Sequence, residues 1–227
     1  MFNLKCPSLI ICSINGRIVI TTHKVGSRFF EEKAGKCSDW KRYEPHFQWN
    51  THDTYVGTIE PSINTQFHFS HGGGLEQKTK SFCDLVGVDK IEDIFTTQPI
   101  TFITRDPWSR FWSGLFEVIG ENINEKINQI DKAILNDTHL SLWNTFLIEL
   151  ILHYEIKEHE IIDLNNPLIT ERYGVKTIAA QESTNRLKYK PWLENEDNKV
   201  YIEKLQTILK PYMDLEINSY NKLLNYE

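Results

Sequence analysis

The feature that most constrains the fold is a pair of short β-branched runs joined by Asn15-Gly16, in the segment SLIICSINGRIVITT. Asn-Gly between two such runs favours a type I′ turn, because both central residues of that turn need positive φ. We therefore expect a strand over 17–22 to pair with a strand over 8–13. Both runs are apolar at consecutive positions, which is typical of strands buried on both faces of a sheet.

Strands then alternate with helices along the chain. PITFITRDP predicts a second buried strand, and Asp106-Pro107 after it predicts a helix with an aspartate cap and a proline in its first position. This alternation predicts an α/β fold, with a mainly parallel central sheet flanked by helices in a single domain over 1–227. The other expected elements are helices from Gly26 to Ala34, over 124–135, 142–155 and 196–209, and from a break at Pro211 to residue 224, with strands at 66–69, EIIDL and KTIAAQES.

Net charge limits the partners of the chain. Its formal charge is -6, with 40% hydrophobic and 25% charged residues, which is typical of a globular protein. Proteins that bind nucleic acid generally present a strongly basic surface, so no nucleic-acid partner is expected. Any site for an anion must therefore be local.

Cysteine usage and the first apolar run indicate the compartment. Cys6, Cys12, Cys37 and Cys83 form no C-x-x-C pair, which favours thiols in a reducing compartment over a disulfide or zinc framework. The run SLIICSI is too short to span a bilayer and lacks a cleavage site of small residues. We therefore expect a cytoplasmic protein with no membrane span and no signal peptide.

The stretch THKVGSRFF predicts an anion site where the strand over 17–22 ends. Backbone N–H groups at the start of the following helix lack internal partners, and the helix dipole favours a negative charge there. Lys24 adds a positive charge and Ser27 a hydroxyl donor, although a surface lysine and a capping serine explain the same residues. Lys24 precedes Gly26, so this is not the G-x-x-x-x-G-K-[ST] loop of nucleotide triphosphatases, and no G-x-G-x-x-G is present.

A second stretch, FITRDPWSRFWSGLFE, places Arg105 at the end of the second buried strand. Ligand sites of α/β sheets lie at such strand ends, and the planar guanidinium suits phosphate. Ser113 lies about two turns into the helix, and Arg110 lies three residues before it. A local salt bridge of Arg105 and a packing role for Ser113 are the alternative.

Together, the K-x-G-S-R and R-D-P-x-x-R-x-x-S stretches resemble the sulfotransferase superfamily, whose members use 3′-phosphoadenosine 5′-phosphosulfate. The first stretch is more similar to carbohydrate-modifying and membrane-type enzymes than to cytosolic enzymes for small phenols. The C-terminal LKPYMDLEINSYNKLL also looks like the closing helix of that group. The resemblance implies a P-loop-like sulfotransferase fold, this co-substrate, and no metal.

The resemblance also implies residue roles. The first stretch would hold the 5′-phosphosulfate, Lys24 would also neutralise the bridging oxygen, and Arg105 and Ser113 would hold the 3′-phosphate. A weaker implied contact is Arg186, in a polar segment QESTNRLKYK that we expect to be a loop. The implied cofactor-binding residues are Lys24, Val25, Gly26, Ser27, Arg28, Phe29, Arg105, Ser113 and Arg186.

Two further roles stay open. Phe29, Trp108 and Trp112 are candidates to stack on adenine, but we expect at least two of them to pack in the core. For the general base we favour His71, then His68, because histidine titrates near neutral pH. Related enzymes use glutamate, which leaves two further candidates, Glu44 and Glu31.

The predicted reaction is sulfuryl transfer to a hydroxyl or amine of a sugar or small metabolite. Two alternatives remain: a kinase-like phosphotransferase acting on a small molecule, and a nucleotide-binding module without catalysis. Segments 40–55 and 124–154 are expected to shape the acceptor pocket. The sequence does not name the acceptor or the oligomeric state.

Overall fold

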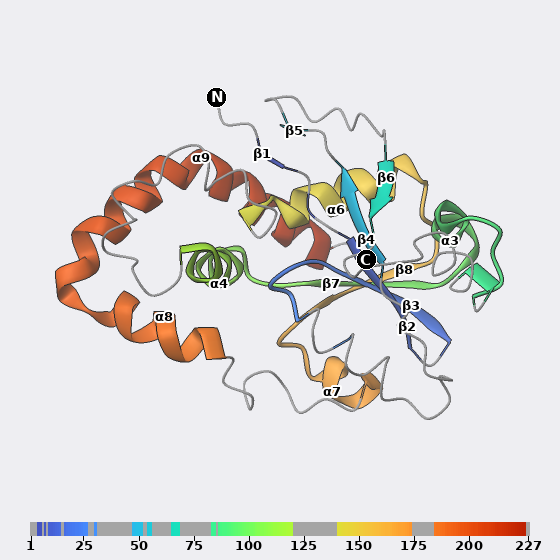
Figure 1. Cartoon of the computed structure of the whole chain (residues 1–227), viewed down its shortest axis with the longest axis horizontal. Helices are drawn as coiled ribbons and strands as arrows, with labels where there is room; N and C mark the ends of the chain where they lie inside the picture. Colours follow the sequence, from blue (N-terminus) through green and yellow to red (C-terminus); the bar gives the residue numbers. More distant parts are fainter. Residues whose placement is uncertain are drawn as a thin grey trace.

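A computed structural model describes most of the strands and helices that the sequence predicts. The described residues are 4–5, 7, 9–14, 16–26, 30, 47–51, 54–55, 65–68, 83–84, 86–119, 140–173 and 184–225. Within them the main sheet has the strand order β6-β4-β2-β3-β7-β8 (Figure 1). Its strands are β2 (Leu9–Ile14), β3 (Arg17–Thr21), β4 (Phe47–Thr51), β6 (Thr65–His68), β7 (Ile100–Thr104) and β8 (His159–Asp163). Two short strands, β1 (Leu4–Lys5) and β5 (Thr54–Tyr55), pair separately.

The predicted N-terminal hairpin is confirmed. Strands β2 and β3 are antiparallel, and Ile14 pairs with Arg17, so two residues connect them. Gly16 in this connection has a φ of 73°, a left-handed conformation that glycine adopts without steric cost. Strand β3 ends one residue earlier than expected, and β2 begins and ends one residue later than expected.

The expectation of a mainly parallel sheet is wrong. The β3–β7 and β7–β8 pairings are parallel, whereas β2–β3, β2–β4 and β4–β6 are antiparallel. The cause is the hairpin itself, because a two-residue turn reverses the chain and makes β2 antiparallel to its neighbour. The parallel part of the sheet is β3, β7 and β8, and the carboxyl ends of these strands meet at one edge.

Helices cover both faces of this part of the sheet. Figure 1 shows α6 and α7 on opposite sides of β7, whose five residues are all buried. On one side, Trp143 of α6 donates from Nε1 to the carbonyl of Ile103 at 2.9 Å. On the other, Tyr173 of α7 contacts the ring of Phe30 edge-on. The described helices are α3 (Ile94–Thr97), α4 (Pro107–Ile119), α6 (Trp143–His153), α7 (Pro167–Tyr173), α8 (Thr184–Glu194) and α9 (Lys199–Leu224), with 3-10 turns at Ile91–Asp93 and Glu196–Asn198.

A second apolar cluster lies among α4, α8 and α9, beyond the carboxyl ends of the strands (Figure 1). Trp108 and Trp112 stack on each other with ring centroids 6.1 Å apart, and Trp112 also contacts Trp192 of α8. Both tryptophans of α4 therefore pack in the core, as expected for at least two of the three aromatic candidates. The third, Phe29, lies outside the described residues.

Helix α9 runs through Pro211 without the predicted break, so that prediction is wrong. A proline inside a helix costs about 3 kcal/mol because it removes a hydrogen bond and crowds the preceding turn. Apolar packing on both sides of the proline offsets this cost: Leu209 and Met213 lie in the second cluster and Leu223 in the main core. Among the described helices, including the 26-residue α9, none has an apolar stretch long enough to cross a membrane.

The segment QESTNRLKYK is also not a loop where it is described, because α8 begins at Thr184. The expected helix over 124–135 and the expected strand KTIAAQES lie outside the described residues. The expected helix over 142–155 is present as α6, and EIIDL is present in β8.

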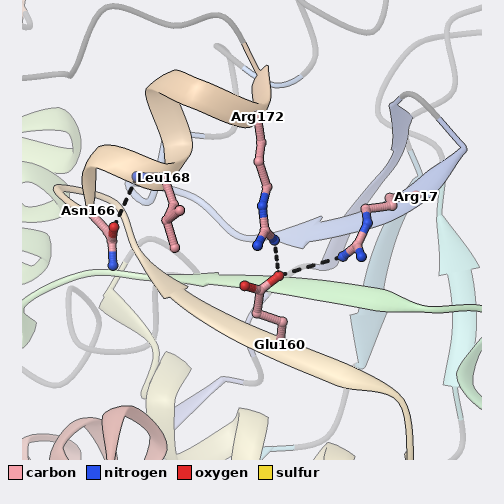
Figure 2. Close-up of polar contacts among 5 residues, drawn as sticks. All are labelled: Arg17, Glu160, Asn166, Leu168 and Arg172. Carbon is pink, nitrogen blue, oxygen red and sulfur yellow. Dashed lines mark hydrogen bonds and ion pairs between the residues drawn. The ribbon is translucent and has the colours of Figure 1, made fainter.

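The amino-terminal edge of the parallel strands carries a cluster of two arginines around one glutamate, which Figure 2 shows. Glu160 of β8 forms ion pairs with Arg17 of β3, at 3.6 Å, and with Arg172 of α7. The hydrogen bond to Glu160 raises the pKa of Arg172. Asn166 accepts the N–H of Leu168 at 3.0 Å and so caps the start of α7. The cluster ties two strands and a helix together at the edge away from the carboxyl ends.

Glu216 joins α9 to the start of α6. Its buried carboxylate accepts the N–H of Asn144 at 2.7 Å, and it accepts both the N–H and the hydroxyl of Thr145 at 3.0 Å. Burial raises the pKa of Glu216, while the positive charge of Arg110 and these hydrogen bonds oppose the rise. The carboxylate thus satisfies N–H groups at the start of α6 that have no partner within that helix.

We expect Glu216→Ala to lower the free energy of unfolding by about 3–5 kcal/mol, because it leaves the buried Arg110 charge without its counter-ion. Urea unfolding followed by circular dichroism measures the change. Glu203→Ala, at an exposed position of the same helix, is the matched control and should change stability by less than about 0.5 kcal/mol. Equal effects of the two substitutions would contradict this role for Glu216.

Candidate functional site

The first predicted anion stretch forms a tight turn after β3. The N–H of Val25 donates to the carbonyl of Thr22 at 3.4 Å, and φ is positive at Lys24 (68°) and at Gly26 (85°). Val25 is fully buried in the main core, so its side chain is not available to a ligand. The N–H of Phe30 donates to the carbonyl of Gly26 at 3.3 Å, which is the spacing of a helical turn. Strand, turn and helical turn therefore follow in the predicted order.

The second predicted stretch begins α4 with the expected aspartate cap. Asp106 accepts the N–H of Ser109 on its carboxylate at 2.8 Å and the N–H of Arg110 on its carbonyl at 2.9 Å. A capping carboxylate satisfies a helix N–H group that would otherwise be available to an anion. The side chains around the start of α4 are therefore better placed than its backbone to bind an anion.

Two arginines bring the two stretches into direct contact. Arg105 donates from Nη1 to the carbonyl of Lys24 at 2.9 Å. Arg110 donates from Nε to the carbonyl of His23 at 3.3 Å. The turn after β3 is thus held, through its own carbonyl groups, against the carboxyl end of β7 and the first turns of α4.

Arg110 is almost fully buried, with 3% of its surface exposed. It also donates to the carbonyl of Ser141, and from Nη2 to the Ser141 hydroxyl at 3.2 Å. Burial lowers the pKa of Arg110 to about 10, an effect that Glu216 opposes and the nearby Arg105 charge reinforces. The guanidinium stays protonated at neutral pH. Sequence reasoning assigned no role to Arg110, which connects the turn to the residues before α6.

One face of α4 meets the turn. Arg110, Ser113 and Glu117 are spaced by three and four residues, so they share a face of the helix. Arg110 contacts the turn as described, and Glu117 Oε2 lies 3.0 Å from Nζ of Lys24. Ser113 lies between them on the same face and is 4% exposed. The structure thus brings Lys24 and Arg105 together at one edge of the sheet, and helix spacing places Ser113 on the face of α4 that meets the turn.

Sequence reasoning missed Glu117. Its only signal is its spacing, four residues after Ser113 and seven after Arg110, which places a carboxylate on the face that the phosphate-binding pattern uses. Its partner in the ion pair, Lys24, has 12% of its side chain exposed, and Glu117 has 31%. The lysine is thus largely enclosed while the carboxylate keeps access to solvent.

Arg105 differs from Arg17 and Arg172 at the opposite edge, which pair with Glu160, and from Arg110, which is almost fully buried. Within the described part of the chain it forms no ion pair, and the acceptor that it meets is a carbonyl oxygen. A guanidinium carries five N–H donors and can bind an oxyanion with two of them. Arg105 is therefore the cation best suited to a phosphate among the described residues.

For the favoured general-base histidines the structure gives only the backbone position of His68. The sheet register aligns His68 with Gln48, Ile10 and Thr21, so its backbone is level with the end of β3. The two strands are three positions apart in the sheet, which corresponds to about 14 Å. The His68 side chain and the whole of His71 lie outside the described residues, so both remain predictions.

The other predicted ligand-binding residues are only partly located. Ser27, Arg28 and Phe29 lie outside the described residues, as do the alternative bases Glu31 and Glu44. Arg186 is in α8, but its side chain is not described. In the ranges that the structure describes, no group of three His, Cys, Asp or Glu side chains is placed to hold a metal ion.

The closing helix reaches the same edge of the sheet. Tyr220 of α9 donates its hydroxyl to Asp163 Oδ2 at 2.7 Å, at the carboxyl end of β8. Burial and, to a smaller extent, this hydrogen bond raise the pKa of Tyr220, so its hydroxyl stays protonated at neutral pH. The contact fixes α9 against β8 beside the strand end that carries Arg105.

Comparisons with protein-family models, with curated proteins and with solved structures found no match to this chain. The residues of the site and their geometry are therefore what a functional proposal has to build on.

The left-handed backbone conformation of Lys24 allows a prediction about the stability of two substitutions at this position. We expect Lys24→Gly to be more stable than Lys24→Ala by about 1 kcal/mol, because a left-handed backbone crowds the β-carbon of alanine. Both variants lose the same ion pair, so the comparison isolates the backbone. Urea unfolding measures the difference, and the same two substitutions at Arg17 in β3 should show the reverse order. A more stable Lys24→Ala variant would contradict the turn geometry.

Proposed function

We propose that this chain is a sulfotransferase, which transfers the sulfuryl group of 3′-phosphoadenosine 5′-phosphosulfate to a hydroxyl or amine of a sugar or small metabolite. The observation that carries the proposal is the contact between Arg105 and the Lys24 carbonyl. It joins two cationic strand ends, and their sequence patterns resemble those of one enzyme superfamily. A P-loop-like sulfotransferase fold in a single domain is part of the proposal.

The donors at this edge fit a ligand with two separate anionic groups. Lys24 supplies an ammonium on the turn after β3, and Arg105 supplies a guanidinium after β7 with no carboxylate partner in the described residues. Thr22, at the start of the turn, has a buried hydroxyl without a hydrogen-bond partner among the described residues. A buried hydroxyl without a partner is unusual, and a ligand oxygen that reached it would supply the missing acceptor.

The proposed roles follow from these positions. The co-substrate supplies the sulfuryl group, and Lys24 would neutralise the negative charge that develops on the oxygen leaving sulfur. Arg105 and Ser113 would hold the 3′-phosphate and so fix the position of the reacting group. His71 remains the proposed base that takes the proton of the acceptor.

We expect 3′-phosphoadenosine 5′-phosphate to raise the melting temperature, because a ligand that binds only the folded state stabilises it by mass action. Differential scanning fluorimetry at equal ligand concentrations tests this, with ATP and AMP as controls that lack the 3′-phosphate. Both controls should have a much smaller effect. Equal stabilisation by ATP would instead favour a phosphotransferase, and a turnover assay with and without chelator then separates an enzyme from a binding module.

We expect Arg105→Ala to weaken binding of the same nucleotide by about 1.5–3 kcal/mol, the usual contribution of a hydrogen bond to a charged group. Isothermal titration calorimetry on folded protein measures the loss. Arg17→Ala is the matched control, because it removes an arginine at the opposite edge of the same strands, and it should leave affinity unchanged. Equal affinity in both variants would show that Arg105 is not a ligand.

A further inference from the structure

An acidic side chain forms an ion pair with the lysine of the proposed site. Glu117 Oε2 lies 3.0 Å from Nζ of Lys24, within the distance of a charge-assisted hydrogen bond. The ammonium belongs to the turn after β3, and the carboxylate lies three turns into α4. No family pattern or composition argument assigns a role to this pair.

A bound phosphosulfate and the Glu117 carboxylate would compete for Lys24. Two negative groups within about 4 Å of one ammonium repel each other, and the repulsion is stronger in a partly enclosed site than in water. A ligand anion that reaches Lys24 therefore favours a rotamer that takes the carboxylate away. Glu117 is 31% exposed, so it has solvent to turn into.

The backbone on the lysine side of the pair is held by two arginines. Arg105 and Arg110 hold the carbonyls of Lys24 and His23. An exchange of partners at Nζ can then proceed by rotation of two side chains, without movement of the turn. This arrangement keeps the lysine positioned before and after the anion arrives.

We propose that Glu117 is a counter-ion gate: its carboxylate holds Lys24 in the ligand-free protein and is displaced when an oxyanion of the phosphate or sulfate class takes the ammonium. The gate rests on the proposed function only for the identity of that oxyanion. Glu117 is a positioning residue in this proposal, because it acts on the ligand through Lys24.

The test is the affinity of Glu117→Gln for 3′-phosphoadenosine 5′-phosphate, measured by calorimetry at low ionic strength. Removal of the competing charge should tighten binding about two- to fivefold, the range expected for a partly exposed ion pair. A purely structural contact predicts no gain. Glu158→Gln is the matched control, because Glu158 is exposed and directly precedes β8, at the opposite edge of the parallel strands, and it should leave affinity unchanged.

Pyrophosphate, titrated into the same three proteins, separates the gate from the proposed function. Tighter pyrophosphate binding in Glu117→Gln, without any binding of the adenosine nucleotide, would support the gate and contradict the sulfotransferase. Unchanged or weaker binding of both probes in Glu117→Gln would overturn the gate. A loss of turnover with unchanged nucleotide affinity would also overturn it, because Glu117 would then act on the acceptor.

Discussion

The buried guanidinium of Arg110 is the interaction on which the geometry of this edge depends. It contacts the turn after β3 through the His23 carbonyl and the residues before α6 through Ser141. Glu216, a buried carboxylate of α9, offsets its charge. A buried charge without a counter-ion is strongly destabilising, so these segments fold together or not at all. Packing alone would leave the turn free to move along α4, whereas a guanidinium with directed N–H groups fixes its position.

Arg105 and Arg110 have different roles, although only five residues separate them in the sequence. Arg110 lies inside the protein, where burial and its hydrogen bonds commit it to structure. Arg105 lies at the strand end, partly exposed, and contacts the turn through one carbonyl. The helix start between them decides this division, because the Asp106 cap begins α4 and turns Arg110 inward on its first turn. One short stretch of the chain thus supplies both Arg110, which holds the turn in place, and Arg105, the cation of the candidate site.

The sequence predicted local features well and long-range ones less well. The Asn15-Gly16 hairpin and the Asp106-Pro107 helix start depend on residues close in sequence, and both are present. The prediction of a mainly parallel sheet was wrong because the hairpin brings antiparallel neighbours, and the prediction of a break at Pro211 was wrong because packing of distant residues keeps α9 continuous. In the site, Lys24 and Arg105 follow from strand-end rules, whereas Glu117 reaches Lys24 only through the fold. No local pattern encodes such a contact.

The net charge of the chain explains why attraction of an anion to this edge has to act at short range. The whole chain has a formal charge of -6, so its average field repels an anion at a distance. Near the turn, the cations Lys24, Arg105 and Arg110 share this edge with the acids Asp106, Asp163, Glu117 and Glu216, so the described residues leave no positive surplus there. At physiological ionic strength these charges act over only about 8 Å. A bound anion would therefore be held by direct contacts rather than by attraction from afar, and in the proposed gate the displacement of Glu117 would leave the Lys24 ammonium to the anion only after it has arrived.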